Sequence, residues 1–255
     1  MLSMKACALC PRKCGIDRTR QTGFCGSGSQ IKVARAALHH WEEPCISGTK
    51  GSGTVFFSGC TLRCCYCQNY RISTGGFGKE ISTKRLGEIF LELQKQGAHN
   101  INLVTATQFV PQVLEALNGV HSQLRIPIAY NCGGYERIET IQALKGAVSI
   151  FMPDFKYVSE TLSTQYSGAP DYFVVATAAI QEMVKQIGGL QYDEQGILQR
   201  GVIIRHLVLP GARKDSFRVL QWIHAHLPKG QYLLSLMSQY TPAGPQSNPA
   251  PLKRR

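Results

Sequence analysis

Short apolar runs alternate with longer amphipathic segments along most of the chain, beginning at residue 54. The runs are of strand length and mostly apolar, which is typical of strands buried on both faces of a parallel sheet. The pattern predicts six strands, at residues 54–57, 101–104, 126–130, 148–152, 202–209 and 232–236. It also predicts helices between them, at residues 84–96, 111–117, 136–144, 171–187 and 217–227. This alternation indicates an α/β fold in which helices cover a parallel sheet.

The segment 84–96 illustrates the helical pattern. Leu86, Ile89 and Leu93 recur at the spacing that places side chains on one face of a helix. Periodicity by itself leaves open whether the six strands form a barrel or an open, doubly wound sheet. Upstream of the six strands, a further short strand is predicted at residues 31–34.

The residues that follow each strand are candidates for a binding site, because ligands of parallel α/β folds bind where the strands end. The candidates are Thr105 and Thr107 after the second strand, Asn131 after the third, Met152, Asp154 and Lys156 at the fourth, and Arg205 near the end of the fifth. The guanidinium of Arg205 is permanently charged and suits a carboxylate. His206 follows it in the same strand and is therefore expected to point to the opposite face.

The first strand leads into a loop that holds Cys60, Cys64 and Cys67 in a C-x3-C-x2-C pattern. Thiolates this close in sequence can converge on one metal centre. Iron–sulfur clusters are commonly held by four cysteines, so three protein ligands leave one iron of a four-iron cluster open to a small molecule. A zinc site or a set of buried structural thiols is the alternative interpretation of these residues.

A second group of cysteines precedes the predicted sheet, where Cys7, Cys10, Cys14 and Cys25 follow a C-x2-C-x3-C-x10-C pattern. The segment has so few large apolar residues that we expect it to need a bound metal or another cross-link in order to fold. Four cysteines at these spacings suit a tetrahedral zinc site or another iron–sulfur cluster. The sequence does not choose between these two metals, and free thiols in a loop are the remaining alternative.

The composition narrows the cellular setting and the class of partner. A chain of 255 residues can form one substantial domain with a small appendage. No apolar run is long enough to span a membrane, and the first residues lack a signal-peptide core, so we expect a cytoplasmic protein. In that compartment ten cysteines favour metal ligation over disulfides. The net charge of +12 suits nucleic acid or an acidic protein, and the scattered positions of the basic residues favour the protein.

Further motifs lie outside the cysteine loop: Cys-Ala-Leu-Cys-Pro-Arg-Lys-Cys at 7–14, Gly-Ser-Gly-Thr-Val-Phe-Phe-Ser-Gly-Cys at 51–60, Cys-Gln-Asn at 67–69, Tyr-Asn-Cys-Gly-Gly-Tyr-Glu at 130–136, Pro-Asp-Phe-Lys-Tyr at 153–157 and Arg-His-Leu-Val-Leu-Pro-Gly at 205–211. With the loop, they resemble radical S-adenosylmethionine (SAM) enzymes of the pyruvate formate-lyase activating enzyme-like branch. The resemblance spans nearly the whole chain and implies a partial (β/α)6, TIM-like barrel. It also implies a 4Fe-4S cluster held by Cys60, Cys64 and Cys67, which leaves Cys65 outside the ligand set.

The resemblance further implies a cofactor site and an electron donor. In these enzymes the open iron binds the amino and carboxylate groups of SAM. An electron from the cluster then cleaves SAM to a 5′-deoxyadenosyl radical that abstracts hydrogen from a substrate. The expected SAM-site residues are Tyr66 beside the adenine, Thr105 and Thr107 for the amino group, Asn131, Asp154, Lys156 and Arg205 for the carboxylate, the ribose or an associated cation, and Met152 along the same segment. The usual donors, flavodoxin and ferredoxin, are acidic, which suits the positive charge of this chain.

Two features depart from the activating-enzyme pattern. Those enzymes usually carry a Gly-Gly-Glu-like segment after the second strand, where this chain has Thr105-Ala106-Thr107. Residues 242–255 form a Pro-rich, basic stretch where relatives usually continue into another helix. The first departure predicts a weaker contact with the amino group of SAM, and the second predicts an incomplete edge of the barrel.

These observations predict a Cys-rich segment and linker at 1–50, a radical SAM core at 51–240 and a disordered tail at 241–255. The predicted function is reductive cleavage of SAM and hydrogen abstraction from a protein or small-molecule substrate, which includes activation of a glycyl radical enzyme. A radical SAM methyltransferase or other modifying enzyme is a less favoured variant. The alternative from another class is a metal-stapled nucleic-acid-binding module without catalysis. No motif in the sequence identifies the substrate.

Overall fold

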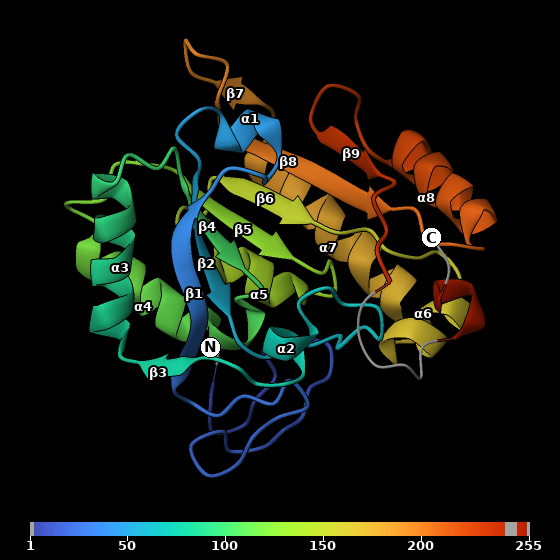
Figure 1. The fold of residues 1–255 in the computed structure, drawn as a ribbon, viewed down its shortest axis with the longest axis horizontal. Coiled ribbons are helices and arrows are strands. Elements are labelled where there is room, and N and C mark those ends of the chain that lie inside the picture. The colour runs from blue at the N-terminus through green and yellow to red at the C-terminus, as the bar shows by residue number, and fades with distance from the viewer. Residues whose placement is uncertain (1–2, 243–248, 254–255) are drawn as a thin grey trace.

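The computed structural model describes residues 3–242 and 249–253 of the chain. At its centre lies a nine-stranded sheet (Figure 1). The parallel strands neighbour one another in sequence order: β2 (Ser52–Phe57), β4 (Ile101–Val104), β5 (Ile128–Cys132), β6 (Ile150–Pro153), β8 (Leu198–Leu207) and β9 (Leu233–Met237). They overlap the six predicted strands, so the α/β fold with a parallel sheet is confirmed.

Helices pack behind and beside this sheet (Figure 1). The predicted ones are α3 (Thr83–Lys95), α4 (Val110–Val120), α5 (Ile138–Ala143), α7 (Tyr172–Ile187) and α8 (Arg213–His226). A further helix, α6 (Glu160–Ser167), is not predicted by the apolar pattern, although Ser159 caps its first turn and Gly168 ends it in a left-handed conformation. The short helices are α1 (Pro44–Ser47), α2 (Tyr70–Ser73), η1 (Thr107–Phe109) and η2 (Ala250–Lys253).

Antiparallel strands extend the sheet at its edges. β1 (Ile31–His39) pairs with β2, and β3 (Lys79–Ile81) pairs in turn with β1. β7 (Gln191–Tyr192) pairs with β8. The predicted strand at 31–34 is thus longer than expected, and it runs against the parallel strands. Among the described strands no pairing joins β9 to β2, so the sheet forms a partial barrel rather than a closed one.

The two faces of the strands have different surroundings. Tyr130 and Phe151 belong to the large core between the sheet and the helices, whereas Ile150 and Met152 belong to a smaller cluster inside the barrel with Ile46 of α1. This division follows from the alternation of side chains along a strand. Toward the C-terminal ends of the strands, the interior face changes from apolar residues to polar ones.

The C-terminal segment differs in part from the expected disordered tail at 241–255. Residues 243–248 and 254–255 of that tail lie outside the described part of the chain. Within the described part, Leu252 is fully buried, and the hydroxyl of Tyr240 donates a hydrogen bond to its carbonyl oxygen. Leu252 packs into the main core, which stabilises this segment against the barrel. No described helix has the length and apolar character needed to cross a bilayer.

Candidate functional site

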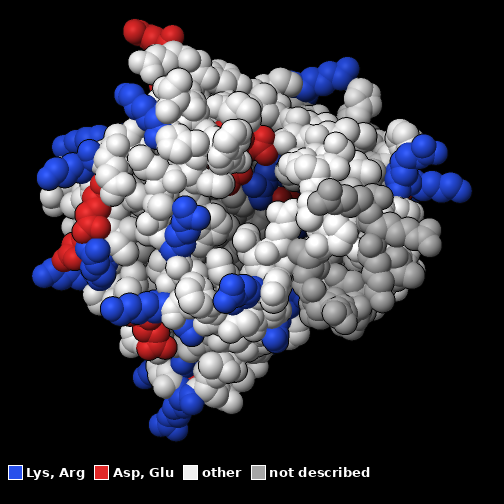
Figure 2. Space-filling model, viewed as in Figure 1, with Lys and Arg blue, Asp and Glu red and all other residues white. Residues whose placement is uncertain are grey.

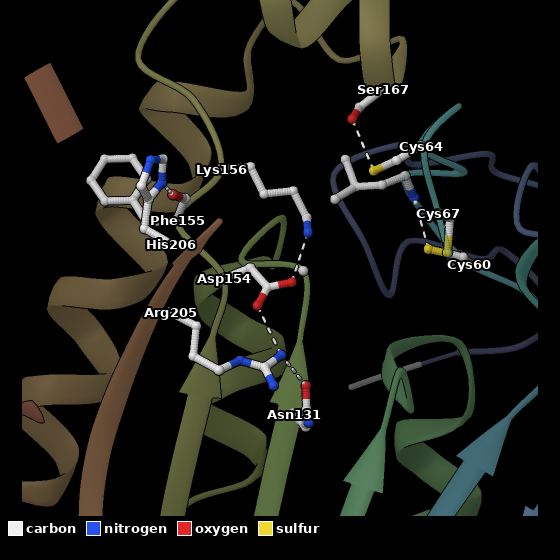
Figure 3. A network of polar contacts seen from close by, with 12 residues as sticks. Cys60, Cys64, Cys67, Asn131, Asp154, Phe155, Lys156, Ser167, Arg205 and His206 are labelled. Carbon is white, nitrogen blue, oxygen red and sulfur yellow. Dashed lines mark hydrogen bonds and ion pairs between the residues drawn. The ribbon is translucent and has the colours of Figure 1, made fainter. Parts of the chain in front are cut away.

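The loop after β2 brings the thiols of Cys60, Cys64 and Cys67 to the C-terminal end of the parallel sheet (Figure 3). Each sulfur accepts one hydrogen bond, from Leu62 N–H to Cys60 (3.4 Å), from Ser167 Oγ–H to Cys64 (2.9 Å) and from Ser73 Oγ–H to Cys67 (3.4 Å). Hydrogen bonds to ligand sulfurs are part of how a protein holds and tunes an iron–sulfur cluster. Three thiols with hydrogen-bond donors on one loop fit the ligands of such a cluster.

The sulfurs of Cys60 and Cys64 lie largely away from water, although both residues are partly exposed. Burial raises the pKa of Cys60 to about 12 and also raises the pKa of Cys64. A bound metal reverses this, because coordination deprotonates a thiol outright. The neighbouring Cys65 donates its N–H to the carbonyl of Tyr166 (2.9 Å). Cys60, Cys64 and Cys65 all pack against the main core.

The arrangement fits a cluster better than a single ion. Within residues 3–242 and 249–253, no three His, Cys, Asp or Glu side chains are arranged to hold one metal ion. In an iron–sulfur cluster the thiolates bind separate iron atoms, so the sulfurs do not converge on one point. Three thiols on one loop, each with its own hydrogen-bond donor, match the set of ligands that such a cluster uses.

A charged cleft of about 190 Å³ lies beside the cysteine loop. Its lining residues are Tyr66, Gln68, Asp154, Lys156, Arg205, Leu207, Met237 and Gln239. Figure 2, viewed from the same side as Figure 1, shows a hollow near the centre of this face with acidic and basic atoms inside it. Polar groups that converge on one volume are a feature of ligand-binding sites.

Asp154 is the centre of the charge network in this cleft (Figure 3). Its carboxylate pairs with Lys156 Nζ at 2.7 Å and with Arg205 Nη2 at 2.8 Å. Burial acts to raise the pKa of Asp154, but the two cations outweigh it and hold that pKa below its ordinary value. Asp154 is therefore ionised at neutral pH, and it keeps both cations charged in a buried place.

Arg205 continues the network into the barrel interior. It donates to Asn131 Oδ1 at 2.6 Å and pairs with Glu42 Oε1 at 3.1 Å. Glu42 also accepts hydrogen bonds from the amides of Asn131 (3.1 Å) and Asn102 (3.0 Å). The sequence did not indicate Glu42, because it lies in a stretch without periodicity between β1 and α1, far from any strand end of the parallel set.

The predicted SAM-site residues separate into two groups. Tyr66, Asp154, Lys156 and Arg205 line the cleft, and Asn131 supports it through Arg205. The other three predicted residues do not line it: Thr105, Thr107 and Met152. As expected, His206 points away from Arg205, and its Nδ1 lies 2.6 Å from the carbonyl oxygen of Phe155.

Met152 and Thr107 have other partners, and Thr105 has an unusual backbone conformation. Met152 is fully buried inside the barrel with Ile150 and Ile203. The hydroxyl of Thr107 donates to the buried carboxyl of Glu136 at 2.7 Å. Thr105 is a non-glycine residue with φ +59°, an uncommon backbone conformation that marks a functional or strained turn.

Gln108 ties the end of β4 to the cysteine loop. Its side-chain amide lies within hydrogen-bond distance of the carbonyl oxygens of Thr105 (2.8 Å), Ser58 (3.0 Å) and Gly59 (3.2 Å). Thr105 and Thr107 flank this contact, so the segment that departs from the activating-enzyme pattern supports the loop. Whether either threonine also meets SAM stays a prediction.

Gly134 brings the ends of β5 and β6 together. It adopts φ +77°, and a Cβ at this position would clash with the carbonyl oxygen of Asp154. The Tyr172 hydroxyl donates toward the carbonyls of Asp154 (2.7 Å) and Gly133 (2.9 Å), and it accepts from Lys156 N–H at 2.9 Å. Glycine here lets the backbone approach closely enough for Asp154 and Lys156 to face the cleft.

Glu136 is a buried carboxyl on the other side of this turn. Burial raises its pKa to about 8, although hydrogen bonds from Thr107 and Tyr130 act against the increase. The folded protein therefore binds a proton that the unfolded chain releases between about pH 4.5 and 8. A group with a raised pKa stabilises the fold most at low pH, and this contribution is lost as the pH rises through the folded-state value.

We therefore expect the free energy of unfolding to fall as the pH rises from 5 to 9, and Glu136→Gln to remove much of this fall. The variant should be more stable than wild type at pH 9 by roughly 2–5 kcal/mol. Urea unfolding at several pH values measures the effect. The exposed Glu139→Gln is the control and should follow wild type. A Glu136→Gln profile parallel to wild type would contradict the assignment.

The N-terminal cysteines pack directly on the cysteine loop. The sulfurs of Cys14 and Cys25 lie on either side of Gly23, where a Cβ would be 3.7 and 3.6 Å from them. The carbonyl of Cys25 accepts the N–H of Cys60 at 3.2 Å. Because a Cβ on Gly59 would lie 2.6 Å from this carbonyl, the contact requires glycine before Cys60. A metal on these N-terminal cysteines stays a prediction.

Arg12 and Arg18 fasten the N-terminal segment to the barrel. Arg12 donates to the carbonyls of Thr61 (3.0 Å), Ser167 (3.0 Å) and Gly168 (2.6 Å). Arg18 is buried and donates to the carbonyl of Gln108 at 2.6 Å. The N-terminal segment, which the sequence predicts as a separate unit, is thus hydrogen-bonded to the cysteine loop, to the end of α6 and to the turn after β4.

The family comparison matches residues 54–186, just over half of the chain, with the model of the Radical SAM superfamily. The uncharacterized protein MJ0674 of Methanocaldococcus jannaschii is 27% identical over 248 residues, which are 93% of this chain and 67% of that protein. The chain is thus similar to a protein about half as long again.

The comparison with solved structures matches two further chains. Methylornithine synthase (PylB) has a TM-score of 0.50 and 13% identity, over 72% of this chain and 51% of that chain. SuiB of Streptococcus suis has a TM-score of 0.46 and 12% identity, over 76% of this chain and 40% of that chain. The chain therefore spans about half of the length of methylornithine synthase and less than half of the length of SuiB. At 13% identity, the similarity to methylornithine synthase supports only the fold, which is a TIM-like partial barrel.

Proposed function

Because this chain belongs to the radical SAM superfamily, we propose that it is an activating-enzyme-like protein that cleaves SAM reductively and abstracts hydrogen from a polypeptide, such as a glycyl radical enzyme. One observation carries the proposal. The three hydrogen-bonded thiols of the loop adjoin a cleft whose charges come from Asp154, Lys156 and Arg205. The motifs shared with activating enzymes support the choice of a polypeptide substrate.

In this proposal Cys60, Cys64 and Cys67 hold a 4Fe-4S cluster. When bound, the cluster supplies one electron, and SAM supplies the 5′-deoxyadenosyl group that abstracts hydrogen. Cys65 takes no part in this proposal, since it falls outside the C-x3-C-x2-C spacing of the other three. The N-terminal cysteines would add a structural zinc or a second cluster that stiffens the segment beneath the loop.

The remaining residues bind and orient SAM. Lys156 and Arg205 offer two cations toward its carboxylate, and Asp154 fixes both of them in place. Arg205 Nε is buried and has no hydrogen-bond partner among the described residues. A donor left without a partner in a binding cleft is the kind of group that a ligand satisfies. Tyr66, which lines the same cleft, provides the aromatic surface for the adenine.

The surface charge favours a protein partner over nucleic acid. Figure 2 shows Lys and Arg in separate groups over the face rather than in one continuous stripe. A net charge of +12 still attracts an acidic protein. We propose an acidic flavodoxin or ferredoxin as the electron donor of the cluster.

The test is anaerobic reconstitution with iron and sulfide, followed by dithionite and SAM. We expect 5′-deoxyadenosine and methionine in equal amounts. The absence of both products from protein that carries the cluster would contradict SAM cleavage. Addition of an inactive glycyl radical enzyme as the polypeptide substrate should then give a glycyl radical signal in the EPR spectrum. SAM cleavage without that signal for any such polypeptide would contradict only the activating-enzyme part of the proposal.

A further inference from the structure

A chain of buried hydroxyl groups connects the cleft to one sulfur of the cysteine loop. The hydroxyl oxygens of Tyr66 and Tyr157 lie 2.6 Å apart, and Tyr157 Oη lies 2.9 Å from Ser167 Oγ. Ser167 in turn donates to Cys64 Sγ at 2.9 Å (Figure 3). Tyr66, Tyr157 and Ser167 are 7%, 1% and 3% exposed, so water does not compete for these hydrogen bonds.

The fold fixes the position of Ser167. This residue is the last of α6, and Gly168 then turns the chain in a left-handed conformation. Arg12 of the N-terminal segment donates hydrogen bonds to the carbonyl oxygens of Ser167 and Gly168. With its backbone fixed at the helix end and its neighbour Tyr157 buried, the Ser167 hydroxyl is preorganised toward Cys64.

The three sulfurs differ in the donor that serves them. Cys60 accepts from the backbone N–H of Leu62, and Cys67 accepts from Ser73 at the longer distance of 3.4 Å. Cys64 has the shortest hydrogen bond, and it comes from a side chain that can be removed by substitution. The Tyr157 hydroxyl donates its hydrogen to Tyr66, and its oxygen lies 2.9 Å from Ser167 Oγ. This contact holds the Ser167 hydroxyl beside Cys64.

We propose that Ser167 is a positioning residue that orients Cys64 and raises the reduction potential of the cluster, with Tyr157 holding the Ser167 hydroxyl in place. The inference rests on the cluster assigned above. One-electron reduction adds negative charge to the cluster without making or breaking a bond in the protein. A donor to a ligand sulfur stabilises that added charge, so removing the donor makes reduction less favourable.

The test compares the midpoint potential of the reconstituted cluster in three variants, by EPR during titration with dithionite in the absence of SAM. Ser167→Ala should shift the potential to a more negative value. Tyr157→Phe, which leaves the Ser167–Cys64 hydrogen bond in place, should give a smaller shift in the same direction. Ser163→Ala is the matched control, because this buried serine lies one turn earlier on α6 and donates only to the carbonyl of Glu160.

Each outcome decides the matter. A loaded Ser167→Ala protein with the potential of wild type and of Ser163→Ala would overturn the proposal. If Ser167→Ala takes up no cluster, Tyr157→Phe decides: a negative shift supports the proposal, and an unchanged potential overturns it. Wild-type protein that binds no 4Fe-4S cluster would instead contradict the proposed function, which distinguishes the two failures.

Discussion

Cys64→Ala protein is expected to lose the 4Fe-4S cluster and with it all cleavage of SAM, whereas Cys65→Ala should retain both. The two cysteines are adjacent in sequence but differ in their surroundings. The sulfur of Cys64 accepts a hydrogen bond from Ser167, and Cys64 belongs to the C-x3-C-x2-C spacing, whereas Cys65 falls outside that spacing. With only Cys60 and Cys67 left, the loop cannot supply the cysteines that a cluster with one open iron needs.

Iron content, visible absorbance and 5′-deoxyadenosine formation after identical anaerobic reconstitution measure the difference. Cys65→Ala is a strict control, because it removes one thiol from the same loop and leaves the number of predicted ligands unchanged. Equal iron content in both variants would show that the cluster assignment is wrong. Loss of iron from Cys65→Ala alone would place the third ligand at that residue.

The parallel part of the fold follows from the sequence because its strands are apolar on both faces and pair in the order in which they occur. An apolar run such as 101–104 cannot be stable unless both faces are covered, which determines the layers. The pattern says less about α6, because its apolar positions are few and its ends depend on the capping serine Ser159 and on Gly168. The direction of β1 depends on tertiary pairing with β2, which periodicity does not encode.

The candidate site follows the same division. Strand-end reasoning predicts the level of the candidate site in the barrel, and Asp154, Lys156 and Arg205, which it singles out, line one cleft there. It does not give the direction of a side chain beyond the strand, where the backbone becomes irregular. Thr107 lies in a 3-10 turn and faces Glu136 for that reason. Met152 still lies within β6 and faces the apolar interior.

Contacts between segments far apart in sequence were beyond prediction. Glu42 approaches Arg205 from 163 positions away, and Arg12 meets Ser167 from 155 positions away. Neither residue belongs to a spacing pattern, since a single charged side chain in a loop is usually solvated. Only the packing of the N-terminal segment and linker on the barrel brings these charges to the site.

The Arg205→Met variant is expected to be less stable than wild type by about 3–5 kcal/mol, because it leaves the buried carboxylates of Glu42 and Asp154 without a common cation. The side chains of Arg205 and Glu42 are each only 13% exposed, so water cannot replace the lost pairing. Lys156 still compensates Asp154, but Glu42 would have no other cation in the network. For a chain of this size the loss corresponds to a decrease in Tm on the order of 10 °C.

Thermal unfolding of the cluster-free protein under reducing conditions measures this effect without a contribution from cofactor loss. Arg85→Met is the control, because Arg85 also pairs with two carboxylates, Glu88 and Glu92, but on an exposed face where such pairs contribute little. Adding Glu42→Gln to Arg205→Met should restore part of the stability, since it removes the unpaired charge. If Arg205→Met unfolds at the same temperature as Arg85→Met, the network does not stabilise the barrel, and its charges serve the ligand alone.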